Sequence, residues 1–172
     1  YKVWRNFTVS DVFEPGSTYK TFTISGALEE GVITPQDTFF CDGGEQVEDY
    51  YINCHAHEYG GHGTLDLSGA LEKSCNDALM QIAAKEGVEM FDKYQILFGF
   101  GQSTNVDLPG EPGDSSLSTL VYHASNMHAV ELATSSFGQG VTTSMMQVAT
   151  AFSSAINGGY YYEPSVVQRI ED

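Results

Sequence analysis

Two residues near the start of the chain have the types and spacing of a nucleophile beside a base. Ser17 follows Glu14-Pro15-Gly16 in the stretch FEPGSTYKTFT, and Lys20 comes three residues later. Positions i and i+3 of a helix share a face, so the hydroxyl and the amine would be neighbours. The positive end of the helix dipole would stabilise an oxyanion at Ser17, and a Lys20 whose pKa is lowered by burial could remove the hydroxyl proton. The alternative is a helix cap beside a solvated charge, because a lone S-x-x-K is common.

A second pair of polar residues lies in EKSCNDALM, where Ser74 and Asn76 are two positions apart. Alone, the pair indicates another helix cap, at the start of the helical pattern NDALMQIAAK. Together with Ser17 and Lys20, it matches the S-x-x-K and S-x-N motifs of the serine enzymes that react with penicillin. The combination favours a catalytic role for all four residues.

Composition limits the classes of partner. The chain has 172 residues, 41% of them hydrophobic, which is enough for one domain with a core. Its 23 acidic and 7 basic residues give a formal net charge of −16, which would repel nucleic acid and anionic lipid. No apolar run is long enough to span a bilayer, and the first ten residues lack the features of a signal peptide. Any membrane anchor is therefore expected outside this sequence.

Helical and extended patterns alternate along the chain without an internal repeat. Asn157-Gly158-Gly159 is expected to stop the last helix. The expected elements are a helix over 17–28, two short strands around Gly43-Gly44 within 38–55, two or three short helices over 64–100 with a break at Gly87, an exposed loop over 103–116, a helix containing His123 and His128, an amphipathic helix over 142–157, and a strand over 165–170.

Nearly the whole chain resembles the transpeptidase domain of class B penicillin-binding proteins, with the matching segments in the order that the family has them. The matching segments are RNFTVSDVFEPGSTYKTFTISGALEEGVI, SCNDALMQIA, FGFG with NVDLPGE, and SFGQGVTTSMMQVATAFSSAINGG with Pro164. Within class B, the sequence is most similar to the elongation and sporulation enzymes of Gram-positive bacteria. The resemblance implies an α/β (α+β) penicillin-binding protein/β-lactamase-like fold, here mainly its helical half with a small hairpin and a partial sheet.

The family's third motif, Lys-Thr/Ser-Gly, is absent, because the only Lys-Thr is Lys20-Thr21 and Phe22 follows it. In the family that motif lies downstream of the segment that ends near VVQRI. We therefore expect residues 1–172 to form a single partial transpeptidase domain, without the N-terminal pedestal, the membrane anchor or the strand that carries the third motif. That strand would bind the substrate carboxylate and supply one oxyanion donor, with the Ser17 N–H as the other.

The resemblance implies D,D-transpeptidation of peptidoglycan. Ser17 would attack the penultimate D-Ala of a stem peptide with Lys20 as base, and a β-lactam would acylate Ser17 in the same way. Ser74 would relay the proton to the leaving group, and Asn76 would hold the acyl amide. The implied partners are stem peptides, β-lactams and a glycosyltransferase, at the extracytoplasmic face of a bacterial membrane to which the parent protein is anchored.

Three cysteines cannot all pair with one another, so Cys41, Cys54 and Cys75 leave at least one thiol over. They could be buried small apolar residues, with Cys41 and Cys54 bridged. Taken with His62, they form a Cys₃His set suited to tetrahedral zinc, although the spacing is not that of a zinc finger. The resemblance favours a structural zinc, since some elongation-type members hold one beside the active site, with a ligand from the middle residue of S-x-N. Either His55 or His57 is an alternative for one ligand.

Two other functions fit parts of the sequence. The stretch HAHEYGGH, with His55, His57 and His62, faintly matches the H-x-H of metal-dependent hydrolases, in which zinc activates water. A non-catalytic module that keeps the scaffold is the second alternative. A metallohydrolase would lose activity to chelators and tolerate Ser17→Ala, whereas a module would show no acylation of Ser17.

Overall fold

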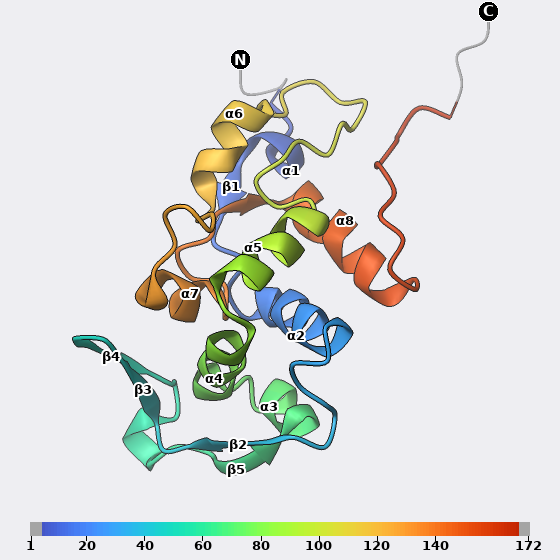
Figure 1. Ribbon diagram of the computed structural model, residues 1–172. Coiled ribbons are helices and arrows are strands. Elements are labelled where there is room, and N and C mark those ends of the chain that lie inside the picture. The colour runs from blue at the N-terminus through green and yellow to red at the C-terminus, as the bar shows by residue number, and fades with distance from the viewer. Residues whose placement is uncertain (1–4, 169–172) are drawn as a thin grey trace, which may run out of the picture.

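The computed structural model describes residues 5–168. A helical body makes up most of the molecule, and two small antiparallel sheets lie at one end of it (Figure 1). Helix α2, Lys20–Glu29, runs through the middle of the body and follows a single 3₁₀ turn, η2, Gly16–Tyr19. The predicted helix over 17–28 is confirmed, although its first turn is 3₁₀.

Helix α2 is buried on two sides, which fixes its position. Ile24 and Ala27 belong to a core shared with helix α4, Asn76–Glu86. Tyr19 and Phe22 belong to a second, aromatic core, in which their rings pack on that of Phe100 with centroids 4.9 Å apart in both pairs. Burial of this much apolar surface on both faces holds the helix that carries Lys20.

The strands pair differently from the sequence prediction. Strand β2, Thr38–Cys41, pairs with β5, Gly63–Asp66, while β3, Gly44–Val47, pairs with β4, Tyr50–Asn53. The hairpin turn is at Glu48-Asp49, so Gly43-Gly44 is not the turn that we expected. Gly44 instead allows close packing, because a Cβ there would lie 2.4 Å from the carbonyl oxygen of Ile52.

Short helices connect the sheets to the body. Helix α3, Leu67–Glu72, begins where Asp66 accepts a hydrogen bond from the Gly69 N–H, and helix α5, Val88–Leu97, begins after the predicted break at Gly87. The remaining elements are α1, Phe7–Ser10; β1, Val12–Phe13; η3, His57–Tyr59; α6, Asp114–Leu117; η4, Ser118–Leu120; α7, Ala129–Ser135; β6, Thr143–Ser144; and α8, Met145–Ile156.

The C-terminal part confirms one prediction and corrects another. Helix α8 is the predicted amphipathic helix, and Ser144 and Gln147 cap its start reciprocally. His123 is not in a helix, because the Asn126 side chain accepts a hydrogen bond from the His123 N–H and closes a turn, and His128 only precedes α7. The structure has no strand over 165–168, and 169–170 lie outside the described residues.

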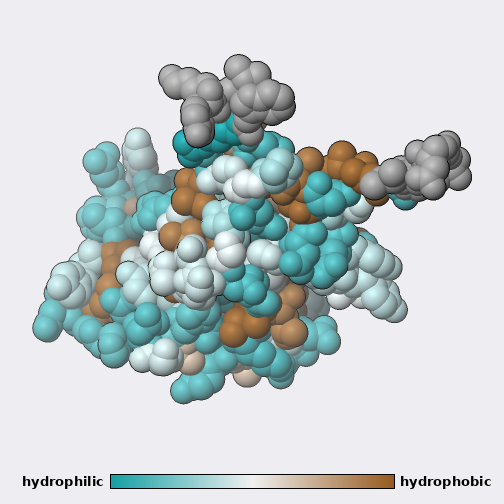
Figure 2. Space-filling model, turned by 90° about the horizontal axis from the view of Figure 1, so that it is seen from above, coloured by the Kyte–Doolittle hydropathy of each residue, from teal (hydrophilic) through white to brown (hydrophobic). Residues whose placement is uncertain are grey.

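The described residues hold no helix long and apolar enough to cross a membrane. Hydrophilic residues cover most of the face seen in Figure 2, with small hydrophobic patches between them.

Candidate active site

The chain that carries Ser17 is fixed by a distant loop. The Gly16 N–H donates to the Gly138 carbonyl at 3.0 Å, and the Gly140 N–H donates to a Glu14 carboxylate oxygen at 2.9 Å. Gly138 has no room for a side chain, since a Cβ there would lie 2.1 Å from the Gly16 carbonyl oxygen. The loop from the predicted SFGQG segment therefore sets the turn at Ser17.

Lys20 connects the two motifs. It is 2% exposed, and its Nζ donates to Ser74 Oγ at 2.7 Å, to the Ser74 carbonyl at 2.6 Å and to Asn76 Oδ1 at 2.7 Å. Ser74 Oγ in turn donates to Ser17 Oγ at 2.9 Å. The structure thus brings together all four residues predicted from the sequence, and the hydrogen-bonded path from Lys20 to Ser17 runs through Ser74.

Burial changes the acid–base behaviour of Lys20. Desolvation lowers the pKa of its ammonium to about 8, against the opposing influence of the Cys54 and Cys75 thiols. A neutral amine is then accessible near physiological pH, as a general base requires.

Local backbone geometry points the S-x-N residues toward Lys20. Ser74 has φ 50°, a left-handed conformation that is uncommon for a residue other than glycine. It lies between α3 and α4, and the next residue, Cys75, caps α4 by accepting the Ala78 N–H at 3.4 Å. Strain of this kind is typical of functional sites.

The three cysteines and His62 also converge. All three thiols are free and buried, and the four potential ligand atoms lie within 4.8 Å of one another. His62 Nδ1 is 3.6 Å from Cys41 Sγ and 3.9 Å from Cys54 Sγ. A zinc tetrahedron with ordinary Zn–S and Zn–N bonds has N···S edges of about 3.6 Å. The donor set and its spacing therefore fit a closed, structural zinc site.

The thiols differ in their proton affinity. Desolvation raises the pKa of the Cys75 thiol. Desolvation also acts on Cys54, but hydrogen bonds from the backbone N–H groups of Ala56, Asp77 and Asn76 outweigh this effect, so the pKa of the Cys54 thiol is lowered. Backbone donors of this kind stabilise a thiolate, which is the form that binds a metal.

The histidine-only arrangement of a metallohydrolase does not form. His55 lies beside His62, with ring centroids 5.0 Å apart and the rings tilted, and His57 packs by Tyr51, with centroids 5.6 Å apart. Within residues 5–168, the group that could hold a metal takes only His62 from the HAHEYGGH stretch. Such a four-ligand set is closed, so it leaves no position for an activated water.

Comparisons with known proteins agree with this geometry. The family described as "Penicillin binding protein transpeptidase domain" matches residues 1–172. The chain belongs to this family. The class B resemblance found in the sequence is confirmed, and so is the fold class. The transpeptidase domain of penicillin-binding protein 3 from Burkholderia pseudomallei superimposes on this chain with a TM-score of 0.85 at 28% identity. The match covers 97% of this chain and 48% of that one.

Individual relatives of this transpeptidase domain are much longer than the chain. Stage V sporulation protein D of Bacillus subtilis is 35% identical over 165 residues, which are 95% of this chain and 24% of the relative. The peptidoglycan D,D-transpeptidase FtsI of Escherichia coli is 32% identical over 166 residues, or 95% and 26%. The chain thus spans about a quarter of the length of these relatives.

The sequence did not predict the contacts that Glu14 and Gly138 make beside the Ser17 turn. Both lie in segments that had been matched to the family, EPGSTYK and SFGQG. A glycine tolerates close approach of another backbone, but the sequence does not say which backbone approaches. The contact joins residues more than 120 positions apart, so only the fold reveals it.

Proposed function

We propose that this chain is the Ser-Lys-Ser-Asn part of a peptidoglycan D,D-transpeptidase. The observation that carries the proposal is the hydrogen-bonded path between Lys20 and Ser17 through Ser74, with Asn76 on the same ammonium. Membership of the penicillin-binding protein transpeptidase family supports it. The names of two relatives, "Probable peptidoglycan D,D-transpeptidase PenA" of Neisseria flavescens and peptidoglycan D,D-transpeptidase FtsI of Escherichia coli, point to the same reaction.

In the acylation step, Ser17 Oγ attacks the carbonyl carbon of the penultimate D-Ala as Lys20, in its neutral form, takes up the hydroxyl proton through Ser74. The tetrahedral intermediate collapses when the C–N bond to the terminal D-Ala breaks. The same proton returns from Lys20 through Ser74 to the leaving amine. The product is an ester between Ser17 and the donor stem peptide, whose amide Asn76 would hold.

In the second step, an amine from another stem peptide attacks the ester and Ser17 leaves. The proton released by the amine returns to Ser17 Oγ by the same path, so the cross-link forms and the site is regenerated. A β-lactam would enter the first step in place of D-Ala-D-Ala. Its ring amide opens, and the leaving nitrogen stays attached, so the ester persists.

Zinc is the proposed structural cofactor. Cys41, Cys54, His62 and Cys75 would hold it, and the ion would supply a cross-link between the sheets and the start of α4. Because Cys75 lies between Ser74 and Asn76, this cross-link would position the S-x-N residues and take no part in the reaction.

Family membership supports a wider setting for this proposal. We expect stem peptides and β-lactams as ligands, a glycosyltransferase as partner, and a site on the extracytoplasmic face of a bacterial membrane. The Lys-Thr/Ser-Gly motif is not in the sequence. The 172-residue chain is therefore expected to acylate slowly. We expect faster acylation from an extended form, meaning a longer form of the protein with the length of its relatives.

Intact mass after incubation with a penicillin tests the proposal. We expect an increment of one drug molecule on the extended form that is lost in Ser17→Ala, with Ser10→Ala as a matched control that keeps it. An extended, folded form that gains no mass would contradict the transpeptidase and favour a non-catalytic module. Activity that survives Ser17→Ala and is lost to a chelator would favour the metallohydrolase.

A further inference from the structure

Glu86, the last residue of α4, is a buried carboxyl group that the proposed reaction does not use. Its side chain is 6% exposed, and within residues 5–168 neither carboxyl oxygen has a hydrogen-bond partner. An ionised carboxylate is costly to bury without a partner. The site therefore favours either a proton or a bound cation on Glu86.

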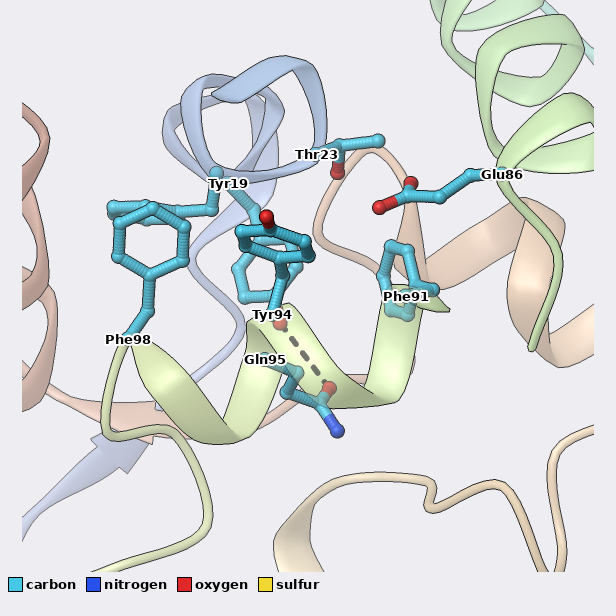
Figure 3. A pocket seen from close by; sticks show the side chains of 8 residues that line it. Tyr19, Thr23, Glu86, Phe91, Tyr94, Gln95 and Phe98 are labelled. Carbon is cyan, nitrogen blue, oxygen red and sulfur yellow. Dashed lines mark hydrogen bonds between the residues drawn. The ribbon is translucent and has the colours of Figure 1, made fainter. Parts of the chain in front are cut away.

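The carboxyl group faces a small cavity between three helices. Figure 3 shows Glu86 reaching from α4 into the space between Thr23 of α2 and Phe91 of α5. The cavity is about 10 Å³, the space of one water molecule. Its lining is mostly aromatic and consists of Tyr19, Phe22, Thr23, Glu86, Phe91, Tyr94, Gln95 and Phe98.

The hydrogen bonds around the cavity leave Thr23 able to accept. Thr23 Oγ1 donates its proton to the Ser136 carbonyl at 2.9 Å, and Tyr19 Oη donates its own to Gln95 Oε1 at 3.1 Å. A protonated Glu86 could donate to Thr23 Oγ1, directly or through one water, whereas an ionised Glu86 would meet no free donor on these two side chains.

The charges near Glu86 are mainly negative. Burial, and to a smaller extent the negative charge of Glu30 at the end of α2, together raise the pKa of its carboxyl to about 8. From α5, Lys93 is paired with Glu30, Tyr94 donates to Glu30 at 3.0 Å, and Asp92 is bonded to His123. Glu29 also lies near Tyr94, and no cation is paired with Glu86 among the described residues.

The packing leaves Glu86 little freedom to move away. A Cβ on Gly26 would lie 2.8 Å from Tyr94 Cγ and 2.9 Å from Glu86 Oε1. Glu86 therefore fills the space above a glycine at which α2, α4 and α5 meet. Helices α2 and α4 begin with Lys20 and Asn76, so a change at this junction reaches both residues through rigid helices.

We propose that Glu86 is a proton-binding group that joins α2, α4 and α5 as a neutral acid, and that loss of its proton in alkaline solution loosens the helix pair that holds Lys20 and Asn76. The neutral acid fits the aromatic cavity, and its O–H can donate to Thr23 Oγ1, directly or through one water. An ionised carboxylate needs more water than a cavity of about 10 Å³ holds. Since the packing leaves the side chain little freedom to move away, its hydration separates the helices.

The pH dependence of stability follows from linkage. An unfolded glutamate loses its proton near pH 4.3, so between about pH 5 and 8 the native state holds one proton more than the unfolded state. Stability from this group therefore falls as pH rises through this window, and the unfolding equilibrium constant grows about tenfold per pH unit. Above about pH 8 the contribution is flat.

Urea unfolding of the chain between pH 5 and 9 tests the proposal, with Glu86→Gln and, as matched control, the exposed Glu89→Gln. The ratio of the unfolding constants of wild type and Glu86→Gln should grow about tenfold per pH unit up to about pH 8, while Glu89→Gln follows the wild type. A constant ratio would overturn the proposal.

Two measurements on the wild type keep the test decisive if Glu86→Gln does not fold. The carboxyl carbon of Glu86, observed by NMR, should titrate near pH 8, and a midpoint near pH 4 would overturn the proposal. Amide exchange of α2 and α4, corrected for intrinsic rates, should rise above pH 8. Amide exchange that stays constant would refute the loosening of the helices. An NMR titration midpoint of Glu86 that moves when potassium or ammonium is added would show that a cation binds there in place of the proton, which would overturn the proposal.

Discussion

Ser74 has the most unusual backbone in the active site, and this has a consequence for its stability. Its left-handed φ of 50° is imposed by the connection between α3 and α4 and is costly for any residue with a Cβ. We expect Ser74→Gly to be more stable than Ser74→Ala by about 1 kcal/mol, because glycine removes the strain while both variants lose the hydroxyl. Urea denaturation measures the difference.

Both variants should lose acylation alike, since each removes Oγ from the path between Lys20 and Ser17. Equal stability of the two variants would show that Ser74 is not strained. A Ser74→Gly variant that acylates at the wild-type rate would contradict the relay through its hydroxyl.

Lys20 should control the pH dependence of acylation. Burial lowers its pKa to about 8, so the neutral base accumulates as pH rises through that value. We expect the acylation rate of the extended form to rise about tenfold per pH unit below pH 8 and to level off above it. A stopped-flow assay with a chromogenic β-lactam between pH 6 and 9 measures the profile.

Two further results would bear on this assignment. The Lys20→Arg variant should acylate far more slowly than the wild type at every pH, because the guanidinium stays protonated. The native state also releases the Lys20 proton before the unfolded state does, so this group makes the protein more stable as pH rises from about 8 to about 10.5. An acylation rate that is independent of pH would exclude Lys20 as the base.

At the scale of elements, the crossing of α2 with α4 and α5 depends on Gly26. Glycine in a helix usually costs stability relative to alanine, so Gly26→Ala should help if the helix were alone. Here the added Cβ would meet Tyr94 and Glu86 at 2.8 and 2.9 Å. We expect overpacking to prevail and the variant to lose about 1–3 kcal/mol in urea denaturation.

Gly113→Ala is the matched control, because a Cβ at this position meets no atom within 4 Å. It should stay within about 0.5 kcal/mol of the wild type. A Gly26→Ala variant as stable as the wild type would show that the three helices can separate without cost.

Helices α2, α4 and α8 were predictable from local sequence, whereas the region of His123 and His128, the strand pairing and the loop contact at the active site were not. Gly87 ends α4, and Ser144 with Gln147 starts α8, because capping depends on residues three or four positions apart. The four catalytic candidates were found by their motifs. Gly43-Gly44 misled the hairpin prediction, since glycine serves both turns and close packing, and only tertiary contacts decide between them.

At the scale of the whole molecule, the cysteine and histidine cluster lies where the two small sheets pack against α4. Cys41 ends β2, Cys54 follows β4, His62 precedes β5, and Cys75 caps α4. A two-stranded sheet has marginal stability by itself. Both sheets of this end of the molecule are two-stranded, so a cross-link to α4 would stabilise them and the turn at Ser74 together.

The zinc proposal predicts a large effect of metal on stability. At a free zinc concentration 100 times the dissociation constant, binding to the native state alone adds about 2.7 kcal/mol. We expect native mass spectrometry to show one zinc per chain, and chelation to lower the melting temperature and speed amide exchange in β2 and β5 more than in α8. His62→Gln and Cys75→Ser should abolish both responses.

His57→Gln is the matched control, because His57 is exposed and packs by Tyr51 outside the cluster. It should keep the zinc and the response to chelator. If this variant or His55→Gln loses the zinc, the substituted histidine is the fourth ligand in place of His62.

Freshly prepared protein that contains no zinc, and whose stability a chelator does not change, would contradict the metal site. The three thiols would then be only part of the buried core. Because Cys75 lies between Ser74 and Asn76, a chelated protein that still acylates at the wild-type rate would show that the cluster supports the fold without positioning the active site.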